Sequence, residues 1–324
     1  MPEIKYFWEN PVDLSLIREA WEAAFSRVLP VSTWEKVWIW RFQANPACEQ
    51  ALAAYILEDD RIACFYAVSP MTIMHPDGSK IKSGLMNMGF THPEFQGRGY
   101  YLELNVRMHE RLKSMGYECL FGFANHNSHY SYRKHLNWQD LSLLTNFQLL
   151  KNTVKSGLLK NGEYQTDDIE LNETVVDSMG SCFVTEERYH IQRSAAFLKW
   201  RLIENPTQKY LCLTTFRSGD ILAYTVYKRF GRNEVDIMEI FYTTIGLTAY
   251  KEILASIMSC LLSKGINSIN IWSNLFSDEH LELEKMGFRE HNVSTHFGVI
   301  DFSGRKDISL ISNWHYRFID SDVY

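Results

Sequence analysis

The chain has 324 residues, of which 46% are hydrophobic and 22% are charged, and its formal net charge at pH 7 is −6. A globular chain of this length typically forms two domains rather than one. The acidic balance argues against a broad nucleic-acid surface, which needs clustered Lys and Arg. No apolar run approaches the roughly 18 residues of a membrane span, and the pattern of the first residues predicts no secretory signal.

The six cysteines are scattered, with no CxxC spacing among them. Most lie in apolar stretches, such as Cys64 within residues 62–65, which is typical of buried thiols in a reducing compartment. The spacing therefore predicts neither a zinc site nor a disulfide framework. We expect a cytoplasmic protein that binds neither nucleic acid nor membrane.

An internal repeat organises the chain. Residues 40–46 read Trp-Arg-Phe-Gln-Ala-Asn-Pro, and residues 200–206 read Trp-Arg-Leu-Ile-Glu-Asn-Pro. In both copies the Trp-Arg pair lies at the end of a helical stretch, which the Asn-Pro should stop because the residue before Pro disfavours the helical conformation. A predicted hairpin follows each Asn-Pro, with strands at 51–57 and 62–68 in the first copy and at 210–216 and 221–227 in the second.

Later in each copy, a helix ends at a glycine and leads into an apolar strand. The first copy has Gly116 followed by a strand at 119–124, and the second has Gly265 followed by a strand at 268–273. The first copy carries about eleven extra residues between its hairpin and this glycine. These features indicate a duplicated fold, in which the first copy has an additional segment.

The additional segment contains a strand, a glycine-containing turn and a helix. Residues 87–91 read as the end of a strand, and a helix begins after Gln96-Gly97-Arg98-Gly99. Unpaired amides and the helix dipole favour a phosphate at such a point, and glycines let it approach the backbone. A Gly-x-Gly turn alone is equally compatible with an ordinary tight turn, and neither the dinucleotide pattern nor the Walker pattern is present.

Residues 92–99, His-Pro-Glu-Phe-Gln-Gly-Arg-Gly, resemble the pyrophosphate loop of the GNAT superfamily of N-acyltransferases, whose pattern is Q/R-x-x-G-x-G/A. Tyr101 departs from this pattern, because the family has a small residue there that lets the helix pack close to the coenzyme. The strand that follows ends with Asn125, and the next helix closes with Leu136-Asn137-Trp138, similar to the Leu-Gly-Phe or Leu-Gly-Trp of the family. Asn137 tolerates the left-handed conformation that such a cap needs.

The resemblance covers the N-terminal copy and extends, without the loop, to the C-terminal copy. It implies an α/β (α+β) fold of two tandem GNAT-like domains, each with a mixed, mostly antiparallel central sheet flanked by helices. We expect an N-terminal domain with the acyl-CoA loop at 1–150, a connector at 151–180 and a C-terminal domain at 181–324. Polar residues at 151–157 and 161–163 suggest the connector.

The resemblance implies direct attack of a primary amine on the thioester of acyl-CoA. A narrower similarity is to tandem GNAT enzymes that acylate nucleotide-linked (dTDP or UDP) amino sugars for bacterial surface polysaccharides. The two Trp-Arg-x-x-x-Asn-Pro segments and the final Asp320-Ser321-Asp322 suggest it. The expected donor is therefore acetyl-CoA or a short acyl- or hydroxyacyl-CoA, and the expected acceptor is such a sugar.

Site residues follow from the same resemblance. A backbone N–H of the strand before the loop, at Met88, Gly89 or Phe90, should polarise the thioester carbonyl. The residues expected to contact coenzyme A are Met88, Gly89, Phe90, Gln96, Gly97, Arg98, Gly99, Tyr100, Asn127 and Tyr130. The residues expected to contact the acceptor are Asn125, His129, Glu239 and Asp320.

The family's usual acid is a tyrosine on the helix after the asparagine. Counting seven residues from Asn125 leads to Tyr132, whereas counting five back from Trp138 leads to Arg133. We choose Tyr132, with Tyr130 as the second candidate. A tyrosine that only packs its ring is the alternative interpretation.

The residues leave several candidates for the general base that removes a proton from the amine. Many relatives use a Glu on the strand before the loop, but Met86-Asn87-Met88 offers no carboxylate. His126 and His129 titrate near neutrality, although either could be an ordinary surface histidine, and we take His126 as the catalytic candidate. Glu239 is the acidic alternative, and it could equally pair with an internal Arg.

No metal is predicted. Asp320 and Asp322 have a spacing that permits a divalent cation, but no third ligand accompanies them, and the pair His126 and His129 lacks a partner pair for zinc. The repeated Trp-Arg pairs could grip phosphates and stack on bases. Their presence in both copies favours a structural role.

A second function remains open: a degenerate GNAT module that binds acyl-CoA as a sensor without turnover. Tyr101, Asn137 and the missing carboxylate favour it. The intact Gln96-Gly97-Arg98-Gly99 segment argues against a purely structural tandem without coenzyme affinity.

Overall fold

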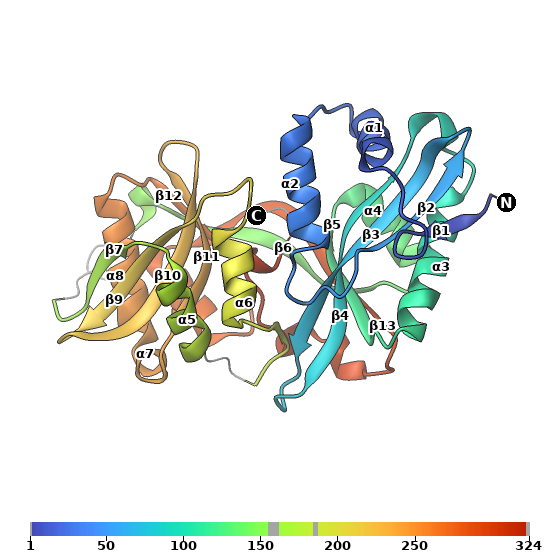
Figure 1. The fold of residues 1–324 in the computed structure, drawn as a ribbon. Helices are drawn as coiled ribbons and strands as arrows, with labels where there is room; N and C mark the ends of the chain where they lie inside the picture. Colours follow the sequence, from blue (N-terminus) through green and yellow to red (C-terminus); the bar gives the residue numbers. More distant parts are fainter. Residues whose placement is uncertain (1, 155–161, 184–186, 322–324) are drawn as a thin grey trace. The chain divides into compact units, whose positions relative to one another are not determined.

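The structure is a computed structural model that describes residues 2–154, 162–183 and 187–321. The chain forms two compact units (Figure 1). Unit 1 comprises Met1–Ser142, Asn205–Thr207 and His296–Ser309, and unit 2 comprises Leu143–Glu204, Gln208–Thr295 and Leu310–Tyr324. The division into domains at 1–150 and 181–324 remains a prediction, and residues 155–161 of the expected connector lie outside the described residues.

Unit 1 is built on a sheet with the order β1-β2-β3-β4-β5-β13. Only β4 and β5 are parallel, and every other neighbouring pair is antiparallel. The strands are β1 (Ile4–Tyr6), β2 (Leu52–Glu58), β3 (Arg61–Met74), β4 (Lys80–Thr91), β5 (Cys119–Ala124) and β13 (Arg289–Asp301).

Helices cover both faces of this sheet, with α1 (Leu14–Phe25) and α2 (Val31–Phe42) on one side and α3 (Tyr100–Ser114) on the other (Figure 1). The sequence of β2 dictates the arrangement, because successive side chains of a strand point to opposite faces. Ala53 and Tyr55 pack with α1 and α2, whereas Leu52, Ala54 and Ile56 pack with α3. Both faces are apolar, so both need a helical cover. The remaining helical elements of unit 1 are η1 (Pro93–Phe95), α4 (His126–His135) and η4 (Lys306–Ser309).

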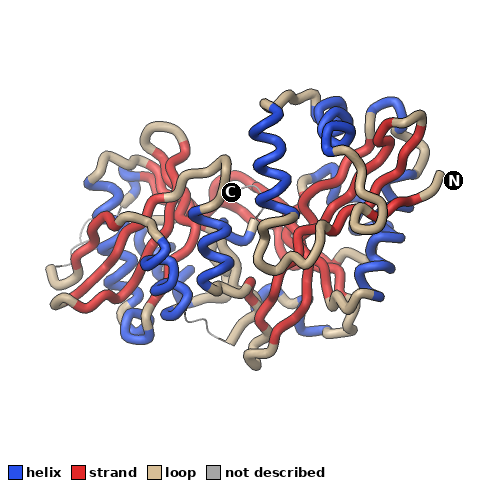
Figure 2. Tube along the Cα trace, viewed as in Figure 1, coloured by secondary structure: helices blue, strands red, loops and turns tan. Residues whose placement is uncertain are grey.

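Unit 2 repeats the same sheet pattern with the order β7-β9-β10-β11-β12-β6, and its parallel pair is β11 and β12. Figure 2 shows its strands between helices. The strands are β6 (Gln139–Leu150), β7 (Gln165–Ile169), β9 (Leu211–Arg217), β10 (Asp220–Phe230), β11 (Glu234–Tyr242) and β12 (Ser268–Ile271), with the short β8 (His190–Ile191) outside this order. The helical elements are η2 (Lys151–Thr153), α5 (Glu173–Cys182), α6 (Ala195–Leu198), η3 (Lys199–Ile203), α7 (Thr244–Thr248), α8 (Tyr250–Ser263), α9 (Asp278–Met286), η5 (Ile311–Asn313) and η6 (Phe318–Asp320).

The two copies exchange their last strands. Strand β6 follows the first-copy helix α4, yet from Leu143 onward it belongs to unit 2, where it pairs with β12. Strand β13 follows the second-copy helix α9, yet from His296 onward it belongs to unit 1, where it pairs with β5. Each sheet is therefore completed by a segment from the other sequence repeat.

The repeated sequence features adopt matching structures. The side chains of Asn45 and Asn205 accept the backbone N–H two residues later, from Ala47 at 2.9 Å and from Thr207 at 3.0 Å. Gly116 and Gly265 both have a φ of 82°, the left-handed conformation that ends a helix without a penalty only for glycine. Asn137 has a φ of 56°, where the second copy has Gly287 at 111°.

The predicted fold class is confirmed, since both sheets are mixed, mostly antiparallel and flanked by helices. All six cysteines are free thiols. Among the described residues, no helix has the length and apolar character needed to cross a membrane.

Candidate functional site: a split sheet and an anion-binding loop in unit 1

The parallel strands β4 and β5 pair over only three positions, from Ser83 opposite Cys119 to Leu85 opposite Phe121. Strand β4 continues to Thr91 on β3 alone, with a bulge that makes Asn87 the extra residue between Met86 and Met88. A bulge bends its strand and locally increases its twist. Beyond Leu85, N–H groups of β4 that point away from β3 have no strand partner among the described residues. Met88, Gly89 and Phe90, the predicted carbonyl-polarising residues, lie in this segment.

The predicted phosphate loop joins this segment to α3. Pro93–Phe95 forms a short 3₁₀ turn, capped by the His92 side chain, which accepts the N–H of Glu94 at 3.3 Å. Gly97 and Gly99 have φ values of 78° and 77°. A Cβ at either position would meet open space, so the backbone conformation, and not crowding, requires glycine there.

The loop presents a row of free amides. The backbone N–H groups of residues 97–102 donate no hydrogen bond within the part of the chain that the structure describes. Residues 96–99 are exposed, and Gly99 caps the N-terminus of the 15-residue helix α3. Unpaired amides and the positive end of a helix dipole at one point form a site for a phosphate or pyrophosphate.

Glu58, at the end of β2, holds the loop in place. Its carboxylate accepts a hydrogen bond from the Tyr100 hydroxyl at 2.7 Å and forms an ion pair with Arg98. The Arg98 guanidinium lies 5.0 Å from the centre of the Phe95 ring, and that ring is buried. The Arg98 side chain therefore stabilises the loop conformation, so that its backbone, rather than its charge, faces an incoming anion.

Three residues meet beside the free segment of β4. A Cβ added to Gly89 would lie 2.6 Å from the Tyr101 hydroxyl, so only glycine allows this ring to approach β4. The Tyr101 hydroxyl lies 3.0 Å from the Tyr132 hydroxyl. The structure thus brings together Gly89 from β4, Tyr101 from α3 and Tyr132 from α4, and Tyr101 fills space that a small residue would leave open. Burial raises the pKa of Tyr101 well above its usual value, with a further contribution from Tyr132.

The other candidates on α4 point elsewhere. Tyr130 is 63% exposed, and its hydroxyl accepts a hydrogen bond from Lys134 at 3.0 Å. The Arg133 side chain is 70% exposed, which favours Tyr132 over Arg133 in the counting conflict. Asn125 caps α4, because its side-chain oxygen accepts the N–H groups of Asn127 and Ser128, each at 3.0 Å. Its cap bonds occupy the oxygen that was expected to contact the acceptor, while Asn127 is exposed.

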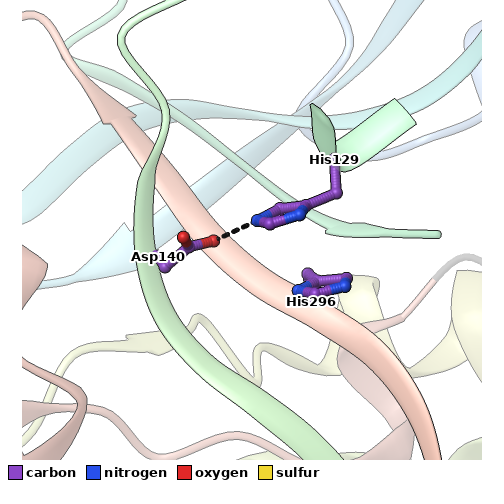
Figure 3. A group of neighbouring side chains, drawn as sticks. All are labelled: His129, Asp140 and His296. Atoms are coloured by element: carbon purple, nitrogen blue, oxygen red, sulfur yellow. Dashed lines mark hydrogen bonds and ion pairs between the residues drawn. The ribbon is translucent and has the colours of Figure 1, made fainter. Parts of the chain in front are cut away.

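Both candidate histidines, His126 and His129, contact His296, and Figure 3 shows His129 beside His296 and Asp140. His129 contacts Asp140 at 2.6 Å through Nε2, and its ring stacks on that of His296 with 3.6 Å between centres. His126 Nδ1 lies 3.0 Å from His296 Nε2. The pKa of His296 is lowered by burial and by the two neighbouring histidines. Burial raises the pKa of Asp140, but hydrogen bonds from His129 and Trp138 outweigh it and leave the value below its usual range.

Glu239 and Asp320, the two candidates in the second copy, are enclosed in unit 2. The Glu239 side chain is fully buried and contacts Arg193 at 2.9 Å and His315 at 3.2 Å. Asp320 contacts the same Arg193 at 2.6 Å and accepts the N–H of Arg317 at 2.8 Å. Pairing with an internal Arg is thus observed for Glu239, and all of these bonds hold the fold of unit 2. Asp322 lies outside the described residues.

The repeated Trp-Arg pairs are buried parts of their units. Trp40 and Trp200 are 8% and 4% exposed. The Arg201 guanidinium donates to the backbone oxygens of Ile319, at 2.9 Å, and of Ser321, at 2.5 Å. These contacts agree with the structural role expected for the repeated pairs.

Comparisons with known proteins agree with this architecture. No protein-family model and no curated protein sequence matches the chain, but solved structures do. A conserved protein from Enterococcus faecalis V583, described as a probable N-acyltransferase, has 13% identity and a TM-score of 0.68 over 94% of this chain and 73% of its own. A tandem GNAT protein from the clavulanic acid biosynthesis pathway has 12% identity and a TM-score of 0.59 over 95% of this chain and 100% of its own.

A third structure, Saccharomyces cerevisiae N-myristoyltransferase with bound myristoyl-CoA, has 9% identity and a TM-score of 0.57 over 93% of this chain and 79% of its own. At these identities the likeness concerns the fold. The chain has a tandem GNAT fold.

The segment after β11 in the second copy differs in structure from the segment after β4 in the first. Where the first copy has its two glycines, the second has the five-residue helix α7, capped by Thr243. A Cβ added to Gly246 in α7 would lie 1.9 Å from the backbone oxygen of Leu222. This glycine therefore allows α7 to pack closely against the backbone of β10.

Sequence reasoning missed several residues of unit 1. Glu58 supports the loop, Tyr101 partners Tyr132, and Asp140 and His296 complete the histidine cluster. Only Tyr101 carried a signal, as a departure from the family pattern. His296 lies 170 positions from His126, and no local spacing relates two residues that only strand exchange brings together.

Proposed function

We propose that this protein is an acyl-CoA-dependent N-acyltransferase that binds coenzyme A in unit 1 and transfers an acetyl or short (hydroxy)acyl group to a primary amine. The observation that carries the proposal is the row of free amides at residues 97–102, at the start of α3 and beside the free segment of β4. The enzymes and the bound myristoyl-CoA of the structural relatives support it.

In the proposed reaction, the pyrophosphate lies on the loop amides and the thioester lies along β4. The amine nitrogen attacks the thioester carbon, an N–H from Met88, Gly89 or Phe90 stabilises the oxyanion, and the C–S bond breaks. Tyr132 protonates the leaving thiolate, and the second proton that the attacking nitrogen loses on becoming an amide restores the Tyr132 hydroxyl. A hydroxyl donates one hydrogen bond and accepts two, so Tyr132 can donate to sulfur while accepting from Tyr101.

The ammonium proton must leave before attack, and we propose His126 as its acceptor. His126 is exposed at the first position of α4. If its Nδ1 donates to His296, its Nε2 keeps a free lone pair and can take the proton. Met86, Asn87 and Met88 provide no carboxylate for this role.

For the acceptor, we propose a dTDP- or UDP-linked amino sugar, on the strength of the repeated Trp-Arg-x-x-x-Asn-Pro segments and the Asp-Ser-Asp ending. A thiol-release assay with acetyl-CoA and longer acyl-CoAs against a panel of these sugars tests it. Release of coenzyme A that depends on one sugar supports both halves of the proposal. Release with other amines but with none of these sugars would support N-acyltransferase activity and contradict the proposed sugar acceptor.

The second candidate is an acyl-CoA sensor, and Tyr101 is the observation that favours it. Its ring fills the space next to Gly89 that the family pattern leaves to a small residue. A sensor would show a rise in melting temperature with acyl-CoA and no thiol release with any amine in the panel.

The loop glycines allow a direct test of the coenzyme site. Gly97→Ala and Gly99→Ala should each weaken acyl-CoA binding about tenfold, because a left-handed Ala costs about 1–2 kcal/mol and the loop would relax away from its amide arrangement. Gly78→Ala is the matched control, since Gly78 has a φ of 85° and equally open surroundings, but lies in the β3–β4 turn. Titration calorimetry with coenzyme A gives the readout, and equal losses in all three variants would count against the loop.

A further inference from the structure

Three side chains of unit 1 that are far apart in the sequence form a compact group (Figure 3). His129 lies on α4, Asp140 at the start of β6 and His296 on β13, opposite Ala124 at the end of β5. Strand pairing positions His296 opposite Ala124, and the cap at Asn125 fixes the start of the helix that carries His129. The group is therefore a product of the fold and not of one flexible segment.

The distances within the group suit a single ion. One ligand atom from each residue lies within 4.8 Å of those of the other two. The ligand atoms of a tetrahedral zinc site, with bonds of about 2.0–2.2 Å, lie roughly 3.3–3.5 Å apart. His129 and Asp140 are already closer than this, at 2.6 Å, and the His129 and His296 rings are stacked at 3.6 Å. An ion would bind all three after one imidazole ring rotates out of this stack, so that both nitrogen lone pairs point at the same place.

The chemical nature of the three ligand side chains indicates which metal would bind. Two imidazoles and one carboxylate form a set that zinc adopts when a fourth position is left for water, whereas magnesium and calcium prefer oxygen ligands only. The side chains of His129 and Asp140 are 15% and 35% exposed, so an ion can enter from solvent.

Neighbouring groups hold the ligands as outer partners do in metal sites. Trp138 Nε1 donates to Asp140 Oδ1 at 2.9 Å. His126 Nδ1 lies 3.0 Å from His296 Nε2, as a hydrogen-bond partner of that ring. We propose that His129, Asp140 and His296 form a binding site for one Zn²⁺ ion, a site that does not depend on acyl transfer.

Zinc binding to the full chain tests the proposal. After removal of metal by a chelator, titration calorimetry with ZnCl₂ should show one ion bound per chain. Because the ion binds the folded state, zinc at about 100 times its dissociation constant should raise the melting temperature by about 5–10 °C. Co²⁺ in its place should give visible absorption bands of a four- or five-coordinate nitrogen and oxygen site.

His129→Gln, Asp140→Asn and His296→Gln should each weaken zinc binding at least tenfold and remove the cobalt bands. His75→Gln is the matched control, since it removes another histidine–carboxylate contact of unit 1, between His75 and Asp77 at 2.8 Å. Circular dichroism and the melting temperature without metal establish that each variant is folded. Absence of a bound ion, or equal zinc affinity in the His75 and His296 variants, would overturn the proposal, whatever the acyltransferase assay shows.

Discussion

Tyr132→Phe should lower the kcat of acyl transfer about 100-fold and leave the KM for acyl-CoA nearly unchanged. Loss of a positioned general acid typically costs 10²–10⁴ in rate, and the ring of Tyr132 packs against Trp138 with 5.5 Å between ring centres, so the phenyl ring keeps its contacts. Steady-state kinetics across pH 6–10 provide the measurement.

Two further tyrosines control this experiment. Tyr130→Phe should leave kcat unchanged, since Tyr130 is exposed and its hydroxyl accepts a hydrogen bond from the surface residue Lys134. Tyr101→Phe should lower kcat less than Tyr132→Phe, because it removes the hydrogen bond at 3.0 Å that orients the acid but keeps the acid itself. If Tyr132→Phe retains full activity, Tyr132 only packs its ring and another group protonates the thiolate.

Arg193→Ala should lower the free energy of unfolding by about 3–5 kcal/mol, the usual result of removing one partner of a buried ion pair. Arg193 is fully buried and contacts both Glu239, at 2.9 Å, and Asp320, at 2.6 Å. Without Arg193, the buried carboxylates of Glu239 and Asp320 lose a positive charge that balances their negative charges. Urea unfolding followed by fluorescence measures the effect. Lys199→Ala, which removes an exposed pair with Glu173, should cost less than about 1 kcal/mol.

The loss should depend on pH in a defined direction. Burial raises the pKa of Glu239, but His315, Arg193 and Arg317 outweigh it and hold the value well below the usual one. Its contribution to stability is therefore complete above about pH 4.3, the usual pKa of Glu, and is lost as the pH falls below it. The difference between wild type and Arg193→Ala should therefore stay nearly constant between pH 7 and about pH 4.3 and shrink at lower pH. A difference that grows toward acid pH would contradict this assignment.

Local features were the predictable part of this protein. The loop at 92–99 has positive-φ glycines, a capping His92 and an adjacent helix start, all of which depend on residues close in the sequence. The same holds for Asn137, whose left-handed conformation follows from its place at the end of α4. The two hairpins and the strands that follow Gly116 and Gly265 could be predicted because alternation and turn residues are local signals.

Long-range contacts were not predictable. Glu239 shows why, since an acid among apolar neighbours reads equally as a site residue or as half of an ion pair, and only the positions of Arg193 and His315 decide which. Likewise, the spacing of His126 and His129 carries no hint of Asp140 and His296. The exchange of β6 and β13 also could not be predicted, because the residues of a strand do not specify which of two similar sheets it joins.

The exchange of β6 and β13 determines when unit 1 can complete its sheet during translation. The free edge of β5 in unit 1 stays unpaired until residues 296–301 of β13 are synthesised, near the end of translation. Until then β5 carries unpaired N–H and C=O groups, which favour pairing with other chains. Nascent chains should therefore depend on holding factors until translation is nearly finished, and truncation before residue 296 should produce aggregates rather than a stable first half.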